Sequence, residues 1–489
     1  MLQPNFNSLT CVKKVSHDVK VNAEALIKAD EEIKKPVSIK AEVFVTAIEK
    51  GEAETLVKGQ VVFEFVYLAE DGYKKIETNT EISAKIPLSD PVISVSAEDV
   101  RITNSENGYL ARANAIIKGV SDASKTYGAL AGGDDLFIRE FTREFDVGTG
   151  MSSDTLTVED EFEVGYAVAE VLMHRESVEL KEVVGGISAV IFDGEVNIAL
   201  SLLPFSENSD ILKEKRTVPF RFEMENVGAL PTMRAYGETQ IKKVAVKVVA
   251  DEGKGKSTIT IELVLGFTGE AVDETSVTMV EDAYSATHAL SIKRDNIEYQ
   301  RFVGQYTYGE KISGTTDAEA IEGGRLITAL GERLNVYSAA TENGRLRASG
   351  TVVADVIFRN ADNGTTVVKA ETPFDIDTEV TGEAAIGKIA LTDFNVKLRN
   401  GGIEFDFAIA IDYRLYENMK TVIISEVAEG EEREVNESAI TVYIPTDNDE
   451  LWDVAKTLGE SEENILKYNP ELTFPLKAED RVIIYRQKL

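Results

Sequence analysis

The sequence is poor in the residues that support covalent cross-linking and catalysis. Among 489 residues it has one cysteine, Cys11, and three histidines, His17, His174 and His288. A single cysteine excludes an intramolecular disulfide and is typical of a reducing compartment. The histidines lie in separate segments without metal-ligand spacing, and phosphate-binding glycine loops and nucleophile elbows are missing. We therefore expect a protein that is not an enzyme and that uses no metal and no cofactor.

Positive charge and long apolar runs are scarce as well. Lys and Arg total 52 against 85 Asp and Glu, which gives a formal net charge of −33. Such a chain repels nucleic acid and anionic lipid, so we expect no nucleic-acid partner. No stretch approaches the roughly 18 apolar residues of a membrane span, and the first twenty residues lack the apolar run of a signal peptide. The sequence predicts no integral membrane segment and a cytoplasmic location.

Alternation of apolar and polar residues is the dominant pattern. Residues 61–71 (VVFEFVYLAED), 257–267 (STITIELVLGF) and 403–416 (IEFDFAIAIDYRLY) alternate with period two and are rich in β-branched and aromatic types. This pattern predicts half-buried antiparallel strands. Turn dipeptides, mostly ending in glycine, separate such runs, as in hairpins. The predicted fold class is mainly β, with antiparallel β-sandwich-like domains.

The turn dipeptides recur in register, which predicts an internal repeat. Three tandem domains follow, at residues 1–150, 151–310 and 311–435. Residues 120–130 and 280–290 are alike and suggest a short helical connector, which the third domain lacks, so that domain is expected to be truncated. The predicted turns fall at 50–51, 71–72 and 107–108 in the first domain, at 193–194, 208–209 and 252–253 in the second, and at 343–344, 363–364 and 400–401 in the third.

The last fifty residues change pattern. Residues 440–485 read as strand, helix, helix and strand. Val442 and Ile444 are expected on the inward face of the first strand, and Asp449 is expected to cap the first helix. Apolar residues at helical spacing form the buried stripe of that helix. Trp452, the single tryptophan, lies at its start, and two interpretations stay open: core packing, or an exposed contact for a partner.

This segment resembles a LysM module, and the predicted domain covers residues 440–489. The resemblance implies a βααβ fold that binds N-acetylglucosamine glycans of a cell wall or chitin. Residues 448–450 (Asn-Asp-Glu) replace the usual Gly-Asp-Thr element, and residues 478–480 (Ala-Glu-Asp) replace a Pro-Gly-Gln type turn. Loss of both groove glycines hinders close approach of a ligand to the backbone, which favours a protein partner. The predicted partner-binding residues are Asp449, Leu451, Trp452, Asn469, Pro470 and Leu472.

The repeated domains resemble the SPOCS domain of clostridial spore-coat morphogenesis proteins. The likeness is carried by residues 39–72 and 331–358, which share the order strand, x-Gly turn, strand and polar turn. It implies a structural adaptor of the mother-cell cytoplasm at the forespore surface, which binds the coat's morphogenetic ATPase scaffold through the LysM module and links coat layers. The alternative is a peptidoglycan- or chitin-binding protein of the cell wall or spore cortex.

Overall fold

The protein is mainly β and its sheets are antiparallel. The computed structural model contains twenty-one strands and two short helices among the residues that it describes. Period-two alternation predicted this class, because each strand places one face on a core and the other toward solvent or a neighbour. The described residues are 3–106, 108–205, 209–251, 253–317, 324–360, 362, 364–399, 402–434 and 440–485.

Unit 1 consists of two three-stranded sheets, with strand orders β1-β6-β5 and β2-β3-β4. The sheets pack face to face around one apolar core, in which Phe63, Phe65 and Ile86 are fully buried. The strands are β1 (Gln3–Ile27), β2 (Lys35–Lys50), β3 (Thr55–Leu68), β4 (Tyr73–Ile86), β5 (Val92–Ser105) and β6 (Gly108–Asp134).

Unit 3 has the same pairing order, in the sheets β14-β19-β18 and β15-β16-β17. Its core includes Phe358, Phe405 and Ile409. The strands are β14 (His288–Asp317), β15 (Arg325–Glu342), β16 (Arg345–Arg359), β17 (Thr365–Glu379), β18 (Glu383–Arg399) and β19 (Gly402–Glu432).

Unit 2 follows this order too, with its two sheets joined at one edge. The meander β11-β10-β9 faces β12 and β13, β8 pairs with β13, and a single pair, Arg234 with Val184, connects β12 to β9. Phe192 and Phe267 are central in its core. The strands are β8 (Ser152–Val164), β9 (Val168–Gly186), β10 (Ala189–Pro204), β11 (Leu212–Glu225), β12 (Arg234–Asp251) and β13 (Lys256–Ser285).

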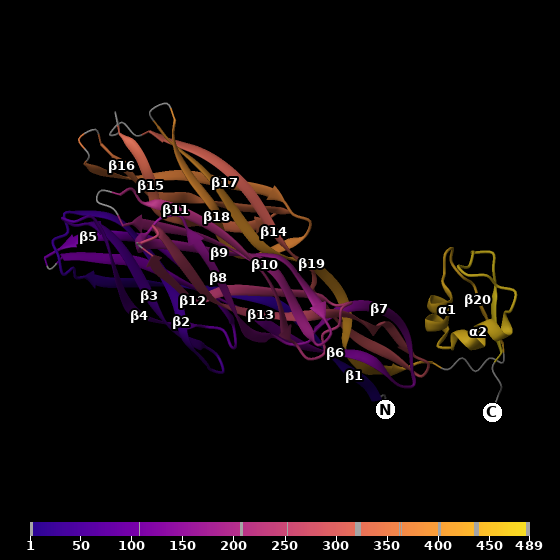
Figure 1. Cartoon of the computed structure of the whole chain (residues 1–489). Helices are drawn as coiled ribbons and strands as arrows, with labels where there is room; N and C mark the ends of the chain where they lie inside the picture. The colour runs from indigo at the N-terminus through magenta and orange to yellow at the C-terminus, as the bar shows by residue number, and fades with distance from the viewer. Residues whose placement is uncertain are drawn as a thin grey trace.

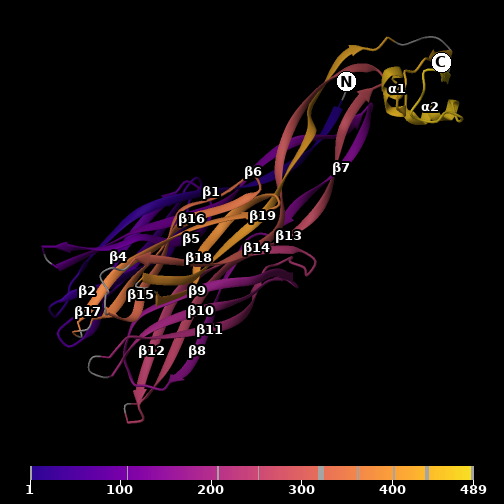
Figure 2. The same cartoon turned by 90° about the horizontal axis from the view of Figure 1, so that it is seen from above.

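A stem extends from the three units toward one end of the molecule (Figures 1 and 2). The strands β6, β13 and β19 run on beyond their sandwiches and pair there with β1, β7 (Leu136–Gly148) and β14. The resulting three ribbons share an apolar core in which Phe145 stacks on Tyr299 with ring centroids 4.2 Å apart. We define the stem as residues 3–15 with 121–134, 136–148 with 272–285, and 288–301 with 417–432.

The C-terminal module lies at the far end of the stem (Figure 2). It comprises β20 (Ile440–Tyr443), α1 (Leu451–Leu458), α2 (Glu462–Tyr468) and β21 (Val482–Tyr485), and β20 pairs with β21. Gly459 ends α1 in the left-handed conformation, and Ser461 accepts a hydrogen bond from the Asn464 amide at the start of α2. Both are ordinary helix boundary devices.

The turn predicted at Asp193 and Gly194 is wrong. Both residues lie inside β10, paired on either side with β9 and β11. The chain turns earlier, at Ser188, which has a φ of 52°. Glycine is needed at 194 because a Cβ there would lie 2.5 Å from the Glu179 carbonyl oxygen and 2.7 Å from the Phe220 ring. Of the other predicted turns, Asn107, Asn208, Glu252, Asn363, Asn400 and Gly401 lie outside the described residues.

The helical connector is also absent from the described residues. Residues 120–130 continue β6, and residues 280–290 cover the end of β13 and the start of β14. These segments are therefore stem strands. The third unit is not shortened, because β19 extends to Glu432 and pairs with β14 throughout the stem. The strand β7 lies inside the predicted domain 1–150 but pairs with β13 of unit 2. The strand β14 begins inside the predicted domain 151–310 but belongs to unit 3.

Candidate binding module and its junction with the stem

The single tryptophan attaches the module to the tip of the stem. Trp452 Nε1 donates to Asp282 Oδ2 at 3.0 Å, and Lys456 Nζ contacts the same oxygen at 2.5 Å. The indole ring meets Tyr284 edge to face, with centroids 5.0 Å apart, and Tyr284 stacks on Phe137. Trp452 is only 7% exposed. Its contacts are thus made within the chain.

Further contacts hold the same junction. Tyr284 Oη donates to the Glu460 carbonyl at 2.6 Å, and Arg433 Nη1 donates to the Lys456 carbonyl at 2.9 Å. Burial alone would raise the pKa of the Asp282 carboxyl, but the hydrogen bonds from Lys456 and Trp452 lower that pKa below its ordinary value. Asp282 is therefore an ionised anchor between stem and module.

Asp449 and Asn469 stabilise the module internally. Asp449 accepts from Tyr443 Oη at 2.8 Å and from the Thr446 amide at 2.9 Å. These bonds close the loop before α1, whose N-cap is Glu450, so the predicted cap was one residue early. The buried Asn469 amide donates to the Ile483 carbonyl at 2.7 Å and its oxygen accepts from the Ile483 amide at 2.8 Å. Asn469 thus pairs with β21 as a neighbouring strand would.

The remaining three predicted residues are distributed differently. Leu451 and Leu472 are half-buried and pack against the module's apolar core, which includes Val454 and Ile465. Pro470 is exposed. The structure therefore brings the six residues into one small module. It places most of their side chains in interior contacts.

The two loops that would border a LysM-type groove are bonded directly to each other. The Asn448 amide donates to the Leu476 carbonyl and the Leu476 amide to the Asp449 carbonyl, both at 2.8 Å. The Ala478 amide donates to Asp447 Oδ1 at 2.8 Å. Backbone amide and carbonyl groups that could hydrogen-bond to a sugar amide are therefore occupied by hydrogen bonds within the module.

One face of the β20–β21 sheet is apolar and exposed, which sequence reasoning missed. Ile440, Val442, Ile444 and Tyr485 are between 49% and 64% exposed. The prediction that Val442 and Ile444 face inward is wrong, because the intervening Tyr443 packs on the core. An offset of one residue inverts the faces of a strand. Alternation favours the face of Ile440, Val442 and Ile444 as the buried one, and the packing of Tyr443 on the module core overrides it.

A buried ionic cluster joins unit 1 to unit 2. His174 contacts Glu176 Oε1 through Nδ1 at 2.7 Å and Glu64 Oε1 through Nε2 at 3.1 Å. Lys40 Nζ donates to the His174 carbonyl at 2.6 Å. Burial and Lys40 would lower the pKa of His174, but Glu176 and Glu64 outweigh them and raise it to about 9. A ring protonated on both nitrogens cannot serve as a general base, so the geometry suits cohesion between units.

Further polar contacts join the units. Ser38 Oγ of β2 donates to Asp355 Oδ2 of unit 3 at 2.6 Å. Lys213 Nζ of unit 2 contacts Glu332 Oε1 of β15 at 2.6 Å. Together with the His174 cluster on β9, these contacts involve the first meander strand of every unit, which is β2, β9 or β15. The three units therefore form one assembly.

Within the described ranges, no group of three or more His, Cys, Asp or Glu side chains is placed to hold a metal ion. No helix in the described part of the chain is long and apolar enough to cross a membrane. We compared the chain with known families, with curated proteins and with solved structures, and none of them matches.

Proposed function

We propose that the chain is a non-enzymatic adaptor of spore-coat assembly, which presents a protein-binding LysM module at the end of a stem. In this proposal the three six-stranded units are copies of one SPOCS-like sandwich domain. The partner is the coat's morphogenetic ATPase scaffold, as the sequence resemblance implies. The site of action is the forespore surface in the mother-cell cytoplasm.

The exposed apolar face of the β20–β21 sheet carries this proposal. Ile440, Val442, Ile444 and Tyr485 lie on a small sheet at the tip of the stem, away from the three units (Figure 1). Exposed apolar side chains grouped on one face are typical of protein interaction sites. Because Trp452 is buried and the loops are bonded to each other, this face holds most of the exposed large apolar side chains among the module's described residues.

The alternative is glycan binding through the LysM groove. Its support is the resemblance to LysM modules, which generally bind N-acetylated sugars. The mutual hydrogen bonds of the loops around Asn448 and Leu476 oppose it, because a sugar amide would have to compete with them. We therefore rank protein binding first.

A binding assay with the purified coat ATPase tests the proposal. We expect the double variant V442D/I444D to bind at least about tenfold more weakly than wild type, because charge on an apolar interface is costly. The control is I187D, which places the same charge on an exposed apolar residue of the β9–β10 turn.

Two results would contradict this account. Equal ATPase binding by V442D/I444D and wild type would remove the sheet face from the interaction. Saturable binding of chito-oligosaccharides in calorimetry, lost on deleting residues 440–489, would support the glycan alternative instead.

A further inference from the structure

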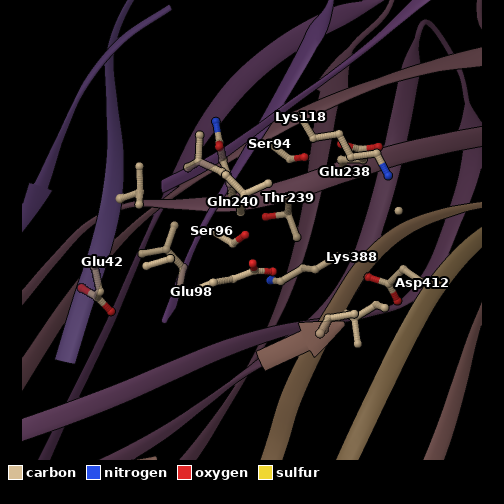
Figure 3. A pocket seen from close by; sticks show the side chains of 18 of the residues that line it. Glu42, Ser94, Ser96, Glu98, Lys118, Glu238, Thr239, Gln240, Lys388 and Asp412 are labelled. Carbon is tan, nitrogen blue, oxygen red and sulfur yellow. The ribbon is translucent and has the colours of Figure 1, made fainter. Parts of the chain in front are cut away.

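A pocket lies where the three units meet, and nothing in the proposed function uses it. Its volume is about 430 Å³. The corresponding strands β5, β12 and β18 of the three units line it, and β2, β6 and β19 contribute further residues (Figure 3). Ser96 and Gly387 at the pocket are exposed, so solvent reaches it. Much of the wall is apolar, formed by Val43, Phe44, Val95, Ile116, Ile241 and Ile389.

Each unit adds a different polar group to this wall. Unit 1 supplies Glu98, unit 2 supplies Thr239 and Gln240, and unit 3 supplies Lys388. Units that only had to pack together could use apolar side chains at these positions. The pocket therefore presents polar groups of different chemistry from all three units.

Among the described residues, Glu98 and Lys388 are the two charged groups of the lining without a direct partner, although Lys20 lies in the surroundings of Glu98, and Asp412 and Glu238 lie in those of Lys388. In the described structure neither side chain forms an ion pair or a side-chain hydrogen bond, and the Thr239 hydroxyl is buried without a partner. Figure 3 shows the Glu98 and Lys388 side chains extending toward each other across the pocket. Leaving such groups partly desolvated and unpaired costs free energy, which a ligand could recover.

Both charges are positioned by irregularities in their strands. The register of β18 against β19 shifts between Ile386 and Ile389, and Lys388 lies in that shift. The register of β5 against β6 shifts directly after Glu98. Bulges redirect side chains and are frequent at binding sites.

The other charged groups of the lining already have partners. Arg414 pairs with Glu238 at 2.7 Å, and Asp412 accepts from the Thr307 hydroxyl at 2.7 Å. Lys118 donates to the Ile386 carbonyl, and Glu42 pairs with Lys40. One lining cation, Lys388, and one lining carboxylate, Glu98, are thus left without a hydrogen bond in the described structure.

We propose that this pocket binds a small zwitterionic molecule with an apolar body, of the size of a short apolar peptide. Its carboxylate contacts Lys388 and its ammonium group contacts Glu98. The apolar side chains of the ligand pack on the walls from all three units. Binding would hold the units together, because a ligand that contacts all three stabilises their assembled state.

Calorimetric titration of the full chain with three probes tests the inference. The probes are dileucine, N-acetyl-dileucine and dileucine amide, so that each blocked form lacks one terminal charge. We expect saturable binding of dileucine and at least about tenfold weaker binding of both blocked forms, because a hydrogen bond to a charged group contributes strongly. Variants K388M and E98Q should weaken dileucine binding to a similar extent.

Thermal melting distinguishes a variant that has lost the binding site from one that has lost its fold. K388M removes an unpaired, partly buried charge, so it should melt at or above the wild-type temperature while losing dileucine. The control K254M changes an exposed lysine outside the pocket and should alter neither property. The inference is overturned if dileucine does not bind, if the blocked probes bind equally well, or if K388M retains wild-type affinity.

Discussion

At the residue scale, Asp282 has the clearest structural role. Its carboxylate receives both Trp452 Nε1 and Lys456 Nζ, and it joins the stem to a module that lies far along the chain. If the carboxylate is removed, both donors lose this hydrogen-bond acceptor. The single tryptophan also makes this contact directly observable, because all indole emission comes from position 452.

We expect D282A to shift the Trp452 emission to longer wavelength and to destabilise the docked module by about 1–3 kcal/mol. The cause is the loss of a hydrogen bond to a buried indole and of an ion pair with Lys456. The matched control is E281A, the neighbouring carboxylate, which is exposed and pairs with Arg139. Unchanged emission in D282A would show that the junction does not depend on this residue.

Because the Asp282 pKa is lowered in the folded protein, its contribution has a defined pH window. The stabilisation is present above the ordinary aspartate pKa of 3.8 and is lost as pH falls through the lower folded value. The junction should therefore hold throughout the neutral range.

His174 leads to a pH prediction of the opposite sign. Its pKa is raised from 6.5 to about 9, so its stabilising effect is complete below pH 6.5 and is lost as pH rises through 9. The shift corresponds to roughly 3 kcal/mol. We expect the melting temperature of wild type to fall between pH 7 and pH 10 more steeply than that of H174Q, which cannot be charged.

Nuclear magnetic resonance of the imidazole carbons gives the direct measurement. Three histidines are present, and H174Q identifies the signal of His174. A titration midpoint below 7 for that signal would contradict the ionic cluster with Glu64 and Glu176.

At the element scale, close strand approach depends on glycine at Gly350 in β16. A Cβ there would clash with the Asn335 carbonyl oxygen of β15 and lie 2.8 Å from the Phe374 ring of β17. We expect G350A to destabilise unit 3 by roughly 3 kcal/mol, because overpacking forces strands apart. Differential scanning calorimetry should show a lower midpoint temperature for the first unfolding transition.

The control for that variant is G165A. Gly165 is exposed, and a Cβ there would meet no atom within 4 Å. Its melting temperature should stay close to that of wild type. If G350A and G165A changed the melting temperature equally, β15 and β16 could separate without a loss of stability.

Strand type and approximate strand position were predictable from alternation, and the pairing partners were not. Residues 61–71, 257–267 and 403–416 fall largely in β3, β13 and β19, because one face of each meets a core. Alternation gives no information on which strand lies alongside, so the stem, built from sequence-distant segments, could not be predicted. The same limit applies to the site: Trp452 was singled out, but its partner Asp282 lies too far along the chain for any local pattern to reveal it.

At the scale of the whole molecule, the stem couples the three units. Its ribbons are the continuations of strands that also form the sandwiches, and their side chains share one core. Loss of any unit should therefore open the stem. Independent domains on a string would behave differently, since each would unfold alone.

Cys11 reports on this coupling, because it is the single cysteine and is buried in the stem core at 5% exposure. Burial raises the pKa of its thiol, which further suppresses the reactive thiolate. Labelling by a thiol reagent thus requires the stem to open. The labelling rate of the full chain measures how often that happens.

We expect F405A in unit 3 to accelerate Cys11 labelling at least about 100-fold, although the two residues lie near opposite ends of the chain. Phe405 is 1% exposed in the unit 3 core, and such a truncation costs about 3–5 kcal/mol. F65A, the comparable truncation in unit 1, should have a similar effect, whereas V249A at an exposed position should have none. If F405A labelled at the wild-type rate while F65A labelled rapidly, the units would be independent, and the stem would be a property of unit 1 alone.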